Sequence, residues 1–223
     1  METLSIGKLT FEQLSKLVQL EEHPMQPYPW TQVSDWVLTE KETLQLSFIA
    51  DRLLEEPAHL LNEATIWGRA IYPLLLLCEQ GEIRARAEVP IAADYPQFKI
   101  SGIADGALGK TIATRVIAPF LVIVEAKRGI EGNDPTIQLY GEMLAAARLN
   151  WQQQPEETRQ ETQIIFGCYT IADTWTFLRG EVRHIDSDRP HLKIEYSQEY
   201  AQKHEGLTIL KLIKSIVHQQ LAP

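Results

Sequence analysis

The sequence predicts an α/β fold in which a mixed β-sheet is flanked by helices. Its expected elements run in the order helix, three strands, helix and further strands. Consecutive strands joined by short turns form an antiparallel meander, and a helix after them can return another strand beside it. Residues 120–124 are apolar on both faces, which is typical of a strand covered on both sides.

The N-terminal region, residues 1–57, is predicted to be a helical elaboration packed on a core domain of residues 58–223. A helix is expected over residues 10–22, since Thr10 and Gln13 have the spacing of a capping box. Residues 33–38 resemble a short strand, and residues 43–55 a second helix.

The core domain begins with a helix over residues 63–79 that Asn62 can cap. Pro73 inside this helix predicts a kink or a break. A second core helix is expected after Asn133, with Pro135 in its first turn, ending near residue 150. A final amphipathic helix is expected over residues 206–221. The predicted strands are residues 82–92, 98–108, 120–127, 163–169, 174–181 and 191–196.

Composition narrows the class of protein. The 223 residues carry 21 basic and 30 acidic side chains, a net charge of −9, which argues against a protein that coats nucleic acid non-specifically. Cys78 and Cys168 lie in apolar segments and are expected to be buried, reduced thiols of a cytoplasmic protein. The longest apolar run, residues 70–78, is too short to span a membrane, so we expect no membrane partner.

A charged interruption of the buried strand is the strongest chemical signal. Glu125 and Lys127 follow the apolar run on one strand face, roughly 6–7 Å apart along the strand. Buried ions are costly unless they pair or bind a metal. If residues near 115 form a hairpin turn, Asp105 lies opposite Glu125, and a divalent cation between them would relieve their repulsion. Two plainer interpretations stay open: a strand-end salt bridge of Glu125 with Lys127, and Asp105 as a turn residue beside Gly106.

These residues resemble the motif of the PD-(D/E)XK nuclease superfamily, which has the restriction-endonuclease-like fold. The likeness is carried by Gly102-Ile103-Ala104-Asp105-Gly106 and by Glu125-Ala126-Lys127, although Ala104 stands where the family has proline. The resemblance spans residues 58–185 and looks nearest to the nuclease domain of type I restriction enzyme restriction subunits.

The resemblance implies roles for individual residues. Asp105, Glu125 and the carbonyl of Ala126 would be ligands of Mg²⁺ or Mn²⁺, and Lys127 would be the catalytic lysine. Glu63 matches an additional acidic residue on the first core helix, and Gln138 matches a glutamine on the second.

We therefore expect a metal-dependent endonuclease, a hydrolase that cuts phosphodiester bonds of DNA. The alternative is a non-catalytic nuclease-fold module that binds or assembles with a protein partner. The acidic net charge motivates this alternative, and also a nuclease whose partner supplies DNA affinity. Homo-oligomerisation stays open.

Overall fold

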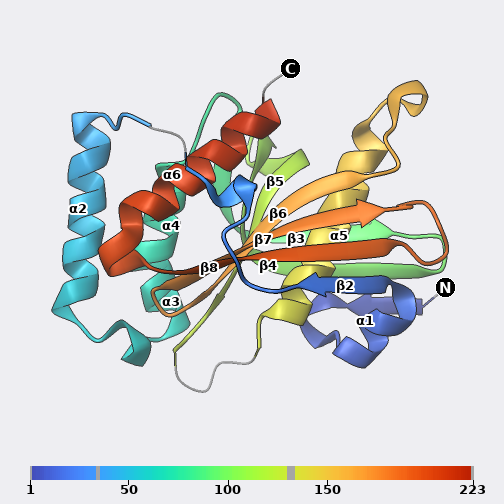
Figure 1. Ribbon diagram of the computed structural model, residues 1–223, viewed down its shortest axis with the longest axis horizontal. Helices are drawn as coiled ribbons and strands as arrows, with labels where there is room; N and C mark the ends of the chain where they lie inside the picture. Colours follow the sequence, from blue (N-terminus) through green and yellow to red (C-terminus); the bar gives the residue numbers. More distant parts are fainter. Residues whose placement is uncertain (1, 34–35, 130–133, 222–223) are drawn as a thin grey trace.

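A computed structural model describes residues 2–33, 36–129 and 134–221. It confirms an α/β architecture with a mixed eight-stranded sheet flanked by helices (Figure 1). The strands are β1 Glu2–Ser5, β2 Gln19–His23, β3 Ile83–Asp94, β4 Phe98–Ile112, β5 Arg115–Lys127, β6 Gln163–Ile171, β7 Thr174–Arg183 and β8 His191–Ala201. The helices are α1 Phe11–Leu17, α2 Glu40–Glu55, α3 Glu63–Ile66, α4 Tyr72–Leu76, α5 Thr136–Gln153 and α6 Gln202–Leu221, with short 3-10 turns between elements.

The sheet has the strand order β1-β4-β5-β6-β7-β8-β2, and β3 pairs with β4. Strands β3, β4 and β5 form the predicted antiparallel meander. Helix α5 then returns β6 parallel to β5, and β7 and β8 continue antiparallel. Both N-terminal strands pair in parallel, β1 with β4 and β2 with β8.

Helices cover both faces of the sheet. On one face, Leu139 and Met143 of α5 share a hydrophobic core with Leu14 of α1. On the other face, Ile49 of α2 and Leu74 of α4 share a second core with α6. Figure 1 shows α6 crossing the sheet on one side while α5 lies behind it. A sheet covered on both sides explains why β5 is apolar on both of its faces.

Two N-terminal predictions were wrong. The helix expected over residues 10–22 has the predicted Thr10 capping box but ends at Leu17, because Val18 is extended and the chain then pairs with β8 as β2. Sheet pairing here overrides the helical pattern of the local sequence. Residues 33 and 36–38 form no strand; the Trp36 indole N–H instead donates to Ser215 Oγ of α6 at 3.0 Å.

The first core helix is interrupted as Pro73 predicted. A π-helical turn at Trp67–Ile71 separates α3 from α4, and Pro73 lies in the first turn of α4. Proline lacks the N–H that an α-helix would use there, and its ring crowds the preceding turn, so a locally wider turn accommodates it. The Asn62 side chain caps α3 by accepting from Thr65 N–H at 2.8 Å. Within the described ranges, no helix is long and apolar enough to cross a bilayer.

Candidate active site

The site forms where β5 separates from β4. Strand β4 pairs with β1 as far as Ser101 and with β5 only from Gly106 onward. Asp105 lies at this divergence, and its Oδ2 accepts the backbone N–H of Ala126 at 2.7 Å. The carboxylate thus takes the place of a ladder hydrogen bond and fixes Asp105 beside the end of β5. Because Asp105 lies inside a strand, its interpretation as a turn residue was wrong.

Glu125 is the buried acid of the site. Its exposure is 0%, and it shares a strand face with Ile123, which packs in the core formed with α5. Burial, followed by the negative charge of Asp105, raises the pKa of Glu125 to about 7. Burial also raises the pKa of Asp105, although the Ala126 N–H opposes this shift. The site therefore disfavours simultaneous ionisation of Asp105 and Glu125.

Lys127 supplies the positive charge. Its Nζ contacts Glu125 Oε1, and its side chain is 18% exposed. Burial alone would lower the pKa of Lys127, but the bond with Glu125 and the charges of Asp105 and Glu63 hold it above its ordinary value. Glu125 and Lys127 do form an ion pair, yet the glutamate is wholly buried rather than at a solvated strand end.

Glu142 is a further site acid, which the sequence analysis did not identify. It is 0% exposed on α5, and Gln138 Nε2 donates to its Oε1 at 3.1 Å. Burial, and next the charge of Glu125, raises the pKa of Glu142 well above its ordinary value. A signal was available, since Glu142 is the only charged residue in the otherwise small or apolar run 139–147. Gln138, predicted from the resemblance, reaches the site through this glutamate.

A hollow of about 230 Å³ opens beside Asp105. Glu63, at the start of α3, lies on its wall, and burial followed by the charge of Asp105 raises the pKa of Glu63. Glu88 of β3 also lines the hollow; it occupies the register position opposite Asp105, and its backbone is left-handed, with φ 49°. Glu88 is exposed on β3, and the sequence analysis did not identify it as a site residue. The wall is completed by Ala64, Trp67, Ala87 and Ala126.

Divalent metal suits the chemistry of these donors. Glu125 Oε2 and Glu142 Oε2 are buried without a hydrogen-bond partner in the described structure. Such orphaned carboxylate oxygens are costly, and hard oxygen ligands are those that Mg²⁺ and Mn²⁺ prefer. No group of three or more His, Cys, Asp or Glu among the described residues is already arranged to hold an ion. The carboxylate oxygens are therefore suitable ligands for a divalent cation. In this structure Asp105 accepts a hydrogen bond from Ala126, and Glu125 contacts Lys127.

Gly106 sets the distance between the indole of Trp67 and β4. A Cβ at this glycine would lie 2.5 Å from Trp67 Cη2, so Gly106→Ala must displace the ring that walls the hollow. We expect a loss of about 1–3 kcal/mol in the free energy of unfolding, measured by urea denaturation. Gly68→Ala is the matched control, because nothing lies within 4 Å of a Cβ there. Equal stability of the two variants would contradict this packing.

The structure thus brings Glu63, Asp105, Glu125, Lys127 and Gln138 into one region and adds Glu142 and Glu88 to it. Ala126 contributes a backbone N–H to Asp105. No known family model matches the chain, and no curated protein matches it either.

Proposed function

We propose that the protein is a metal-dependent nuclease of the restriction-endonuclease-like kind, acting on DNA. The observation that carries the proposal is the fully buried Glu125, which shares one site with a second carboxylate, Asp105, and with the ammonium of Lys127. Buried acids with raised pKa values and a specific cationic neighbour, placed beside a hollow, are typical of functional sites. The likeness of these residues to the PD-(D/E)XK pattern gives the reaction class.

Asp105 and Glu125 would hold the cation, and Glu142 lies close enough for the charge of Glu125 to raise its pKa. When bound, Mg²⁺ or Mn²⁺ supplies Lewis-acid stabilisation of phosphoryl charge and lowers the pKa of coordinated water. Lys127 has N–H donors that can orient a water molecule or meet negative charge on a phosphate oxygen. Gln138 orients Glu142 by donating to its Oε1.

The acidic charge of the chain opposes DNA binding. Its net charge is −9, and the hollow is walled by Glu63, Glu88 and Asp105. Phosphates approach such a surface unfavourably until a cation neutralises it. This charge supports a nuclease that works with a protein partner supplying DNA affinity. It also keeps the non-catalytic assembly module as the second candidate.

Cleavage of labelled single- and double-stranded DNA tests the proposal. With Mg²⁺ or Mn²⁺ the wild type should cut, and chelation should stop it. The double variant Glu125→Gln, Lys127→Ala should be inactive, whereas Lys99→Ala, which removes a surface lysine paired with Asp94, should behave as wild type. A folded protein that takes up no metal and leaves both substrates intact would favour the assembly module. Cleavage by the double variant at the wild-type rate would show that Glu125 and Lys127 do not form the active site.

A further inference from the structure

Helix α2 is apolar on two sides. Ile49 and Leu53 are buried against the core, as expected for a surface helix. Leu44 and Phe48 project from a different side of the same helix and are 65% and 60% exposed. Figure 1 shows α2 at the margin of the molecule, and the exposure of Leu44 and Phe48 leaves this second apolar side open to solvent.

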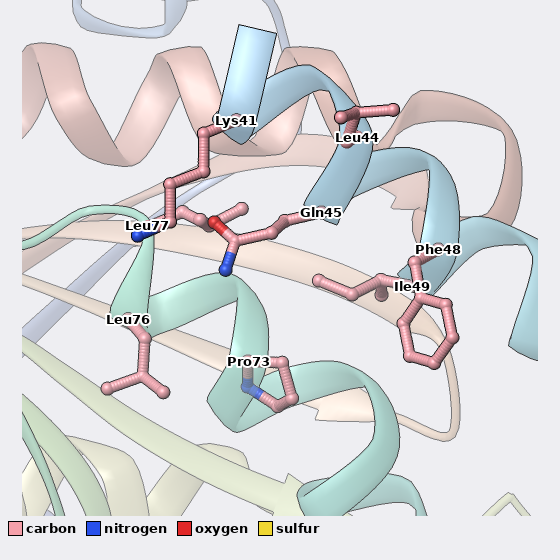
Figure 2. A pocket seen from close by; sticks show the side chains of 8 residues that line it. All are labelled: Lys41, Leu44, Gln45, Phe48, Ile49, Pro73, Leu76 and Leu77. Carbon is pink, nitrogen blue, oxygen red and sulfur yellow. The ribbon is translucent and has the colours of Figure 1, made fainter. Parts of the chain in front are cut away.

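A groove runs along this side of α2. It has a volume of about 430 Å³, and α4 forms its other wall (Figure 2). Leu44 and Phe48 stand on the α2 side, and Pro73 and Leu76 on the α4 side. Leu76 is itself 45% exposed. A contiguous apolar surface of this kind, rimmed by charge, is typical of an interaction site.

The charges on α2 indicate what covers the groove. Lys41 lies in the first turn and Glu55 ends the helix, and they are equally distant in sequence from Phe48. Lys41 lies at the positive, N-terminal end of the helix dipole and Glu55 at the negative, C-terminal end, so the macrodipole of their own helix stabilises neither charge. Glu55 has a neighbour in Arg52 at 3.4 Å, an exposed pair of small worth. A second α2 running antiparallel, with Phe48 at the two-fold axis, would place Lys41 of each chain against Glu55 of the other.

We propose that this surface, Leu44, Phe48 and Leu76 with Lys41 and Glu55, is a homodimer interface in which α2 pairs with α2 of a second copy. A two-fold interface must be self-complementary, and one helix that carries opposite charges on either side of an apolar centre meets that condition. The paired helix is about 24 Å long, since each residue rises 1.5 Å. Leu44 of one chain then packs on the stem of Arg52 of the other, which already lies over its own Phe48. The inference is independent of the proposed nuclease activity.

Sedimentation velocity over a concentration series tests the interface. The wild type should dimerise reversibly. Lys41→Glu and Glu55→Lys should each weaken the association about tenfold or more, because like charges then face each other twice. An equimolar mixture of the two variants should associate again. In the mixed dimer the two substituted positions face each other with opposite charges, and the other end keeps the native pair of Lys41 with Glu55.

Phe48→Glu removes the apolar centre and should give a monomer, while Phe11→Glu changes a comparably exposed phenylalanine on α1 and should leave dimerisation intact. Circular dichroism checks that every variant is folded. A wild type that stays monomeric at the highest concentration would overturn the proposal. Dimerisation that survives Phe48→Glu, or a charge-variant mixture that fails to associate, would overturn it as well, and would leave the groove to a different protein partner.

Discussion

Replacing Lys127 with methionine is expected to lower the rate of DNA cleavage by about 10²–10³-fold while leaving metal uptake in place. Methionine keeps the length and the apolar stem of lysine but has no N–H donor. Lys127 contacts Glu125 but is not itself a proposed metal ligand, so the variant keeps the carboxylates that would hold the cation. It loses only the N–H donors that would contact the water or the phosphate. Single-turnover cleavage and Mn²⁺ calorimetry on the same samples measure the two effects.

Glu125→Gln provides the contrast, because it should lose both cleavage and metal uptake. Lys99→Met, on the surface of β4, is the matched control and should change neither. A Lys127→Met protein that cuts DNA as fast as wild type would remove the lysine from the reaction. Loss of metal uptake in Lys127→Met, equal to that in Glu125→Gln, would instead make the lysine a support for the carboxylates.

Replacing Glu142 with glutamine is expected to stabilise the metal-free protein at pH 8 by about 1–3 kcal/mol. Glu142 is fully buried, its Oε2 has no partner in the described structure, and its pKa is raised by burial and by Glu125. Glutamine keeps the oxygen that accepts from Gln138 and removes the charge. A functional site commonly carries such a cost in stability.

The pH dependence of this gain has a definite sign. A buried acid whose pKa is raised on folding holds its proton more tightly in the native state, so its destabilising effect grows as pH rises above its unfolded pKa. The gain from Glu142→Gln should therefore be small near pH 5 and larger at pH 8, in urea denaturation with chelator present. Glu161→Gln, at an exposed position, should change stability little at either pH. A Glu142→Gln protein that is less stable than wild type at pH 8 would show that the charge of Glu142 is structurally compensated.

Strand and helix order in the core could be read from the sequence because its patterns are strong. The three strands before α5 lie where they were predicted, although β5 begins earlier, at Arg115, and β4 and β8 end later. The N-terminal strands could not be read, since β1 and β2 are short edge strands that depend on partners β4 and β8 far along the chain. Pairing of that kind leaves little trace in local hydrophobic periodicity.

The candidate site was partly predictable for the same reason. Asp105, Glu125 and Lys127 stand out as polar residues in or beside apolar strands. Glu142 was missed because α5 carries its acid within a helix, where an isolated glutamate resembles a surface residue. The lone acid in the run 139–147 could have marked Glu142 as unusual, but only its burial and its interaction with the charge of Glu125 show that it belongs to the site.

Calorimetric titration of the metal-free protein with Mn²⁺ tests the central claim, that the carboxylates gathered at the end of β5 hold a divalent cation. The account predicts saturable uptake by the wild type at pH 8, weaker uptake near pH 6 because the pKa of Glu125 is raised to about 7 and the metal must displace its proton, and loss of uptake in Asp105→Asn. Absence of uptake by a folded wild type, or undiminished uptake by Asp105→Asn, would contradict it.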